Sequence, residues 1–208
     1  LDIFSDASLS NLTSAEVINY MKNRANDSLK KLGLKSIFDI DDTLVVTNSK
    51  IKVHDHSNNK YYELTPKEFN EYQKDPNDVL DFSDFQNPDI LKAGRIIDWV
   101  MNVLQKTMQV ERAVGVITAR DSKDLIVEFL LHNGVDINPD FIFAVNDRDS
   151  GFTGSIAERK KQAFIKFIDM GFRNFKFFDD DPENLRLAKQ LEKEYDIKMF
   201  TRQVRKQF

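Results

Sequence analysis

The sequence contains no cysteine among its 208 residues. A chain without thiols has no cysteine nucleophile, no disulfide, no thiolate zinc site and no cysteine-ligated iron–sulfur cluster. Long apolar runs are also missing, since none approaches the roughly 18–20 residues that span a bilayer. The first residues lack the basic and then apolar layout of a signal peptide. We therefore expect a cytoplasmic protein without a membrane partner, whose chemistry uses side chains other than cysteine.

A strong excess of one charge is absent as well. The 34 acidic and 30 basic side chains give a formal net charge of −4, so the whole molecule has no general attraction to nucleic acid. The best basic candidates are modest: residues 159–161 and the late residues Arg202, Arg205 and Lys206. In contrast, an apolar fraction of 41% with 17 phenylalanines is ample for a folded core. The length predicts one main domain with room for a small insertion.

Short runs rich in Ile, Val or Phe predict five buried strands, and a helical apolar pattern lies between each strand and the next. The predicted strands are 36–39, 113–117, 141–145, 175–178 and 197–201. The predicted helices are 90–106, 122–133, 157–170 and 182–194. Strands that alternate with helices indicate an α/β fold, a three-layer Rossmann-like arrangement in which helices cover both faces of a parallel sheet.

Two segments fall outside this alternation. Residues 1–33 are predicted as a polar lead-in and a helix over 14–31, which begins at the capping box Thr13-Ser14-Ala15-Glu16 and ends near Gly33. Residues 47–89 are polar, with alternating runs at 51–53 and 61–64 and a short helix after Thr65-Pro66. We predict that 47–89 is a hairpin and helix inserted after the first strand, so that the core consists of 34–46 and 90–208.

Acidic side chains follow two of the predicted strands at the point where each strand ends. Asp39, Asp41 and Asp42 follow the first strand, and residues 179–181, all Asp, follow the fourth. Ligands of open parallel sheets bind at the carboxyl ends of the strands, so we expect both clusters in one site. Adjacent carboxylates repel one another, and a hard divalent cation is the simplest way to neutralise them. Asp39 and Asp41, two positions apart, fit a nucleophile and a proton carrier on one face.

A hydroxyl stands at the end of the second predicted strand. Thr118 is followed by Ala119 and Arg120, just before the next predicted helix. Its hydroxyl and the backbone N–H groups at the start of that helix are suitable donors to an anion. For Arg120 two interpretations stay open, a contact with substrate and a surface salt bridge.

The third predicted helix has two lysines near its front that suit the neutralisation of phosphate charge. Lys160 is followed at positions three and four by Ala163 and Phe164, apolar residues that would bury one side of this helix. This spacing favours Lys160 over Lys161 as the lysine that is directed into the site.

The order of these motifs resembles that of the haloacid dehalogenase superfamily of phosphohydrolases. The segment Asp39-Ile40-Asp41-Asp42-Thr43 matches the first motif, Asp-x-Asp-x-Thr, in full, and Thr118, Lys160 and Asp179-Asp180 match the second, third and fourth. The stretch from Phe177 to Asn184 is similar to that of small magnesium-dependent phosphatases and of polynucleotide-kinase phosphatase domains. The general character of the sequence resembles that of phage-encoded members of the superfamily, which would work in the host cytoplasm. The resemblance covers about residues 34–203.

This resemblance implies a mechanism and a set of ligands. Asp39 is the expected nucleophile, which forms an aspartyl-phosphate, and Asp41 is the expected acid and base. The Mg²⁺ ion is expected between the Asp39 carboxylate, the Asp41 backbone carbonyl and Asp180. Thr118 and Lys160 are expected to hold the oxygens of the phosphoryl group, and they form the expected substrate-binding set together with Ala119 and Arg120. Further candidates for the site are Asp179, Lys161 and Asn184.

In this superfamily the segment between the first and second motifs often forms a cap, so residues 47–89 are the expected cap. Because this segment is short, it would leave the site open to a metabolite, a nucleotide, a nucleic-acid end or a phosphoprotein. The likeness to polynucleotide-kinase phosphatases favours a nucleotide or nucleic-acid phosphate. The expected activity is that of a Mg²⁺-dependent phosphomonoesterase. Two alternatives remain, a phosphotransferase and a non-catalytic binding or structural module with the same fold.

Overall fold

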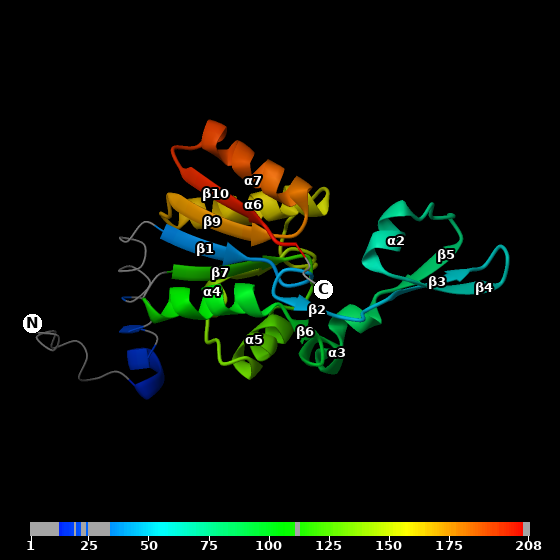
Figure 1. The fold of residues 1–208 in the computed structure, drawn as a ribbon, viewed down its shortest axis with the longest axis horizontal. Helices are drawn as coiled ribbons and strands as arrows, with labels where there is room; N and C mark the ends of the chain where they lie inside the picture. The colour runs from blue at the N-terminus through cyan, green and yellow to red at the C-terminus, as the bar shows by residue number, and fades with distance from the viewer. Residues whose placement is uncertain (1–12, 19, 22–23, 25–33, 111–112, 206–208) are drawn as a thin grey trace, which may run out of the picture.

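The computed structural model describes residues 13–18, 20–21, 24, 34–110 and 113–205. At its centre is a five-stranded sheet with strand order β10-β9-β1-β7-β8, in which all neighbours are parallel (Figure 1). The strands are β1 (Leu34–Phe38), β7 (Ala113–Thr118), β8 (Ile142–Ala144), β9 (Asn174–Asp179) and β10 (Lys198–Gln203). Each overlaps one predicted strand, so the predicted α/β class with a parallel sheet is confirmed.

Helices connect these strands and pack on both faces of the sheet. They are α4 (Asp98–Gln109), α5 (Lys123–His132), α6 (Ile156–Asp169) and α7 (Pro182–Glu194), with a short 3-10 helix η3 (Pro139–Phe141) before β8. Phe164 of α6 contacts Phe177 at a ring distance of 4.9 Å, whereas Trp99 of α4 contacts Phe178 at 6.5 Å. Neighbouring residues of a strand point to opposite faces, so α4 and α6 lie on opposite sides. The arrangement is of the Rossmann-like kind.

A close approach between α6 and the sheet explains one glycine of β7. A Cβ at Gly115 would lie 2.9 Å from Phe167 Cζ and 2.8 Å from the Phe141 carbonyl oxygen. Phe167 in turn meets Phe143 edge to face, with ring centroids 4.9 Å apart. This packing fixes α6 against the sheet, and with it the position of the lysines in the second turn of the helix.

The predicted continuous helix over 90–106 is interrupted at residues 93–97. A short helix α3 (Pro88–Lys92) is followed by Gly94 and by the strand β6 (Arg95–Ile96), which pairs antiparallel with β2 (Val45–Val46); α4 begins only at Asp98. A Cβ at Gly94 would collide with the side chain of Val45. The contact between these short strands therefore requires glycine here and separates the two helices.

Residues 47–89 form a lobe that projects from the carboxyl edge of the central sheet (Figure 1). The middle strand of the lobe, β3 (Ile51–Asp55), pairs antiparallel with β4 (Lys60–Leu64) and β5 (Asp78–Asp81). The lobe also contains α2 (Pro66–Glu71) and the 3-10 helix η2 (Ser83–Gln86). The predicted hairpin and helix are present, and Thr65 and Glu68 cap α2. The strand β5 escaped prediction because it begins and ends with Asp, a residue that is depleted in strands.

Near the N-terminus, the described residues 14–18, 20–21 and 24 are helical. The predicted capping box is present: the Thr13 N–H donates to Glu16 Oε2 at 2.7 Å, and the Glu16 N–H donates to Thr13 Oγ1 at 3.3 Å. The lead-in 1–12, the remainder of the predicted helix with Gly33, and Lys206 lie outside the described residues. Among the helices that the structure describes, none combines the length and the apolar character needed to cross a membrane.

Candidate functional site

The carboxyl ends of β1 and β9 bring the two acidic clusters together. Phe38 is paired with Phe178 in the parallel register, and the Asp39 N–H donates to the Phe178 carbonyl at 3.0 Å. This hydrogen bond extends the ladder by one residue, so that Asp39 leaves β1 beside Asp179, the last residue of β9. The parallel pairing is therefore the reason why residues 140 positions apart in the sequence share one site.

Lys160 is a buried cation between these two carboxylates. Its side chain is 3% exposed, and its Nζ lies 2.8 Å from Asp179 Oδ2 and 3.0 Å from Asp39 Oδ1. Burial acts to lower the pKa of Lys160, but the charges of Asp179 and Asp39 outweigh it and hold this pKa above its usual value. Lys160 therefore stays an ammonium group inside the site.

Lys161 is directed elsewhere. Its Nζ forms an ion pair with Glu194 at the end of α7, away from the acidic cluster. Ala163 and Phe164, on which the preference for Lys160 was based, are both completely buried. The periodicity of α6 thus separates the two lysines as the spacing indicates, with Lys160 alone of the two in contact with Asp39 and Asp179.

Asp179 is fixed by groups of its own loop as well as by Lys160. The Asp181 N–H donates to Asp179 Oδ1 at 2.9 Å, and Asn184 Nδ2 lies 3.0 and 3.1 Å from the two carboxylate oxygens. Asp181 in turn caps α7, because its carboxylate accepts a hydrogen bond from the Glu183 N–H at 2.8 Å. Asn184 therefore acts on the site through Asp179, as a positioning residue.

Three carboxylates form a cluster that is suitable for a metal ion. Ligand atoms of Asp39, Asp179 and Asp180 all lie within 4.8 Å of one another. Hard oxygen donors of this kind are the ligands that Mg²⁺ prefers. The cluster includes Asp39 and Asp180 of the predicted ligand set and adds Asp179. The Asp41 carboxylate is bound by Arg120 instead, so the backbone carbonyl remains the atom by which Asp41 is predicted to contribute.

Burial and the surrounding negative charge raise the pKa values of two carboxyl groups in the cluster. Burial raises the pKa of Asp39 well above its usual value despite Lys160, and Asp179 and Asp180 raise it further. Burial also raises the pKa of Asp180 to about 7, together with the charges of Asp179 and Asp42. One lysine does not balance three carboxylates, and a divalent cation would supply the missing charge. The donor set therefore fits Mg²⁺.

We expect the metal-free protein to lose stability as the pH rises from about 4 to about 7. The folded pKa of Asp180, about 7, lies above the value of 3.8 for an unperturbed Asp, so the folded state binds more protons in this window. The contribution of Asp180 to the free energy of unfolding is therefore most favourable below about pH 4 and falls by up to ~4 kcal/mol by pH 7. Asp39 acts in the same direction. Urea unfolding at a series of pH values in EDTA measures this slope.

The matched variants for this experiment are Asp180→Asn and Asp140→Asn. An amide does not titrate, so Asp180→Asn should flatten the slope, while Asp140 is exposed on η3 and its replacement should leave the slope as it is. Equal slopes for Asp180→Asn and the parent chain would contradict the expectation. Added Mg²⁺ should stabilise the parent chain most at the higher pH values, where the carboxylates are ionised.

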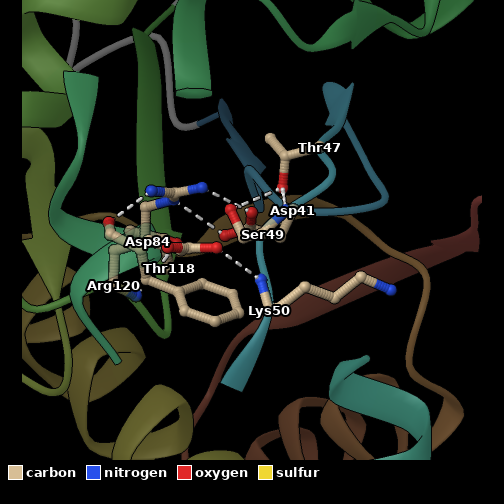
Figure 2. A network of polar contacts seen from close by, with 8 residues as sticks. Asp41, Thr47, Ser49, Lys50, Asp84, Thr118 and Arg120 are labelled. Carbon is tan, nitrogen blue, oxygen red and sulfur yellow. Dashed lines mark hydrogen bonds and ion pairs between the residues drawn. The ribbon is translucent and has the colours of Figure 1, made fainter. Parts of the chain in front are cut away.

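Arg120 binds Asp41 in a two-pronged ion pair (Figure 2). Its Nε lies 3.0 Å from Asp41 Oδ2 and its Nη2 lies 2.8 Å from Oδ1, and the side chains are 1% and 31% exposed, respectively. The remaining nitrogen, Nη1, donates to the carbonyl oxygen of Phe85. The sequence left Arg120 between a substrate contact and a surface salt bridge. The structure places Arg120, which is itself buried, in an ion pair with Asp41 of the first motif, so it is no surface salt bridge, and the contact with substrate stays a prediction.

The 3-10 helix η2 links the inserted lobe to this edge. Asp84 accepts a hydrogen bond from the Lys50 N–H at 3.1 Å (Figure 2). It also accepts one from Lys52 Nζ at 2.8 Å. Two residues further, Gln86 Nε2 donates to Asp121 Oδ2 at 2.6 Å. Together with the Phe85 carbonyl, these contacts join β3, η2 and the residues after β7. No part of this link was predicted, because polar contacts between distant segments leave no local pattern.

Thr118 and Ala119 lie where the sequence places them, at the end of β7. Thr118 is completely buried, and its Oγ1 accepts a hydrogen bond from the Arg120 N–H at 3.3 Å. A hydroxyl that accepts one hydrogen bond still has its own hydrogen to donate. Ala119 is half-buried and brings its backbone to the same edge.

Comparison with protein-family models found no match for this chain, and a search of the curated proteins found none either. The fold and the site define the protein by class: an α/β protein with a parallel sheet, at whose carboxyl edge three carboxylates cluster and two of them contact a buried lysine.

Proposed function

We propose that this chain is a Mg²⁺-dependent phosphomonoesterase of the haloacid dehalogenase type. The observation that carries the proposal is the cluster of Asp39, Asp179 and Asp180, in which Asp39 and Asp179 contact the buried Lys160. A nucleophilic carboxylate, a fixed cation and oxygen ligands for a metal are the parts that phosphoryl transfer requires, since its catalysis is mostly positioning and charge stabilisation. The four motifs occur in the order found in that superfamily, which supports the same assignment.

Two carboxylates carry the proposed reaction. The Asp39 carboxylate attacks phosphorus while the bond from phosphorus to the leaving oxygen breaks, which gives an aspartyl-phosphate and an alcohol. Asp41 donates a proton to the leaving oxygen. It then takes a proton from the water that attacks the phosphorus of the aspartyl-phosphate, and the bond to Asp39 breaks. Inorganic phosphate leaves, Asp39 is a carboxylate again, and Asp41 is protonated again.

The other residues of the site hold charge in place. Thr118 and Lys160 bind oxygens of the transferring phosphoryl group, and Asp179 and Asn184 hold Lys160 and the loop in position. When Mg²⁺ is bound by Asp39, Asp180 and the Asp41 carbonyl, it supplies the positive charge that allows a carboxylate to approach an anionic phosphoryl group. The buried Lys160 adds a second positive charge on the side of α6.

In the proposed role, the Asp41 carboxyl group must leave its ion pair with Arg120 and contact the leaving oxygen of the substrate. Arg120 is buried and also donates to the Phe85 carbonyl, whereas about a third of the Asp41 side chain is exposed. Asp41 is therefore the partner that moves. Because Phe85 belongs to η2, the 47–89 lobe is in contact with the group that holds Asp41, and we assign this lobe the role of a small cap.

The same ion pair favours a second candidate function. With its carboxylate fully paired to Arg120, Asp41 is not available as an acid in this conformation. A non-catalytic module that keeps the fold and the metal site would have this arrangement permanently. The two candidates differ in whether Asp41 is released when a phosphoester enters the site.

A phosphate-release screen with Mg²⁺ and with EDTA tests the proposal. Its substrates are an aryl phosphate, mononucleotides, sugar phosphates, phosphopeptides and oligonucleotides with a 3′- or 5′-phosphate. We expect release that requires Mg²⁺, stops with EDTA and returns when Mg²⁺ is restored. A folded chain that binds Mg²⁺ but releases no phosphate from any substrate would support the binding module. New phosphoesters in the presence of added alcohols would identify a phosphotransferase.

A further inference from the structure

The neighbouring strands β9 and β10, at one side of the central sheet, carry exposed side chains on one of their faces. On the opposite face α6 and α7 pack against the sheet, where Phe175 and Phe177 meet Phe164. On the open side α4 packs against β1 and β7, further along the sheet. Figure 1 shows β9 and β10 in front of α6 and α7, with α4 running beside β7.

The strand register determines which side chains lie on this open face. Phe178 contacts Trp99, and Arg202, which is paired with Phe178, has its guanidinium 6.0 Å from the Trp99 ring. Because side chains alternate along a strand, the open face also carries Lys176 of β9 and, on β10, Phe200 and Lys198. We call Trp99 together with these positions of the two strands the β9–β10 face.

This face is positively charged in a protein that is acidic overall. Lys176, Lys198 and Arg202 are exposed, as is Arg205 just beyond β10, and none forms an ion pair with a carboxylate of the residues that the structure describes. The side-chain positions of both strands on this face include no acid: Asn174, Lys176, Phe178, Lys198, Phe200 and Arg202. Like charges on one face repel one another, so an anionic partner would relieve this repulsion.

Aromatic rings lie between these cations. Phe200 is 60% exposed, a large fraction for a phenylalanine on a strand. Trp99 is half-buried and carries the Arg202 guanidinium over its ring. Cations that follow a phosphate backbone, with aromatic rings on which bases stack, are the means by which proteins bind single-stranded nucleic acid.

The β9–β10 face ends beside the acidic cluster. A pocket of about 660 Å³ is lined by Trp99, Thr201, Arg202, Gln203 and Arg205. The Gln203 side chain donates to the backbone carbonyl of Asp180 at 3.0 Å, so this pocket adjoins Asp180 of the acidic cluster. From Arg202 the face continues along β10 to Lys198, a distance of about 13 Å at the usual rise of a strand.

We propose that the β9–β10 face binds single-stranded nucleic acid and leads a terminal phosphate of that strand into the acidic site. Lys176, Lys198, Arg202 and Arg205 bind backbone phosphates, and Trp99 and Phe200 stack against bases. The delivery of a terminal phosphate rests on the function proposed above. Binding of the strand to this face does not, because it requires neither the metal nor Asp39.

The direct test measures binding without chemistry. Fluorescence anisotropy follows a labelled single-stranded oligonucleotide that has no terminal phosphate, with the full chain in EDTA at several salt concentrations. Lys176→Glu with Arg202→Glu removes two phosphate contacts and should lower the slope of log affinity against log salt by about 1.4, at ~0.7 for each contact. Phe200→Ala should weaken binding about tenfold and leave this slope unchanged.

The control variant is Lys166→Glu with Lys193→Glu. Both lysines are exposed on α6 and α7, on the other side of the sheet, and the change in net charge is the same. This variant should bind the oligonucleotide with nearly the affinity and slope of the parent chain. No binding by the parent chain at low salt, or equal losses in the control and the Lys176–Arg202 variant, would overturn the proposal.

Activity measurements separate this proposal from the proposed function. The Lys176–Arg202 variant should hydrolyse a small aryl phosphate as the parent does, but release phosphate from a phosphorylated oligonucleotide less efficiently, by the factor lost in binding. Oligonucleotide binding without phosphate release from any substrate would contradict the proposed phosphatase function and still support nucleic-acid binding by the β9–β10 face. The assignment to nucleic acid would be overturned if oligonucleotides bound equally to all variants while the binding of a phosphopeptide required Lys176 and Arg202.

Discussion

Asp39→Asn is expected to lower phosphate release by about 10³-fold or more while the protein stays folded. An amide does not attack phosphorus, so the aspartyl-phosphate cannot form. The fold should tolerate the change because Asn has nearly the same shape. Burial already raises the pKa of Asp39, so the carboxylate is costly to ionise and a neutral side chain is readily accepted. Lys160 keeps Asp179 as its partner in the variant.

The matched control is Asp42→Asn, which removes the same charge from the same loop. Asp42 has a φ of 58°, a left-handed conformation in which Asn is well tolerated. This variant should retain most of the activity on an aryl phosphate. Steady-state rates with Mg²⁺, and circular dichroism to verify the fold, measure both variants. Asp39→Asn with activity close to that of Asp42→Asn would rule out the carboxylate nucleophile.

The sequence contains enough local information to locate the centre of the site. Asp39 and the acidic run that starts at Asp179 each follow a strand whose apolar residues are contiguous, so the position of both at a strand end can be predicted. The parallel arrangement follows from the alternation of strands and helices, and it places these ends side by side. The periodicity of α6 then selects Lys160 over Lys161. Each step depends on neighbours within a few positions.

The contacts that escaped prediction all join distant segments. Arg120 and Asp41 are 79 positions apart, and nothing near either residue indicates that the other is its partner. Likewise, the sequence shows only the modest basic residues near Arg202, because Trp99 and Lys176 join them through the sheet register and the position of α4. The roles of these residues depend on tertiary packing, which a single sequence does not encode in any local spacing.

Lys160→Met is expected to be the most destabilising single change at the site. It leaves Asp39 and Asp179 buried without their cation, and removal of one partner from a buried ion pair typically costs about 3–5 kcal/mol. The loss should be small at low pH, where the carboxylates are protonated, and should grow as the pH rises. Urea unfolding of the metal-free protein measures it, and phosphate release should fall as well because Lys160 binds the phosphoryl group.

Two further variants show whether the loss comes from charge or from packing. Lys161→Met removes a lysine whose ion pair with Glu194 is partly exposed, so it should change the free energy of unfolding by no more than ~1 kcal/mol. Lys160→Met with Asp179→Asn removes the cation together with one of the carboxylates it neutralises. If uncompensated charge is the cause, this double variant recovers much of the stability but none of the activity. A double variant that is no more stable than Lys160→Met would instead assign the loss to packing around α6.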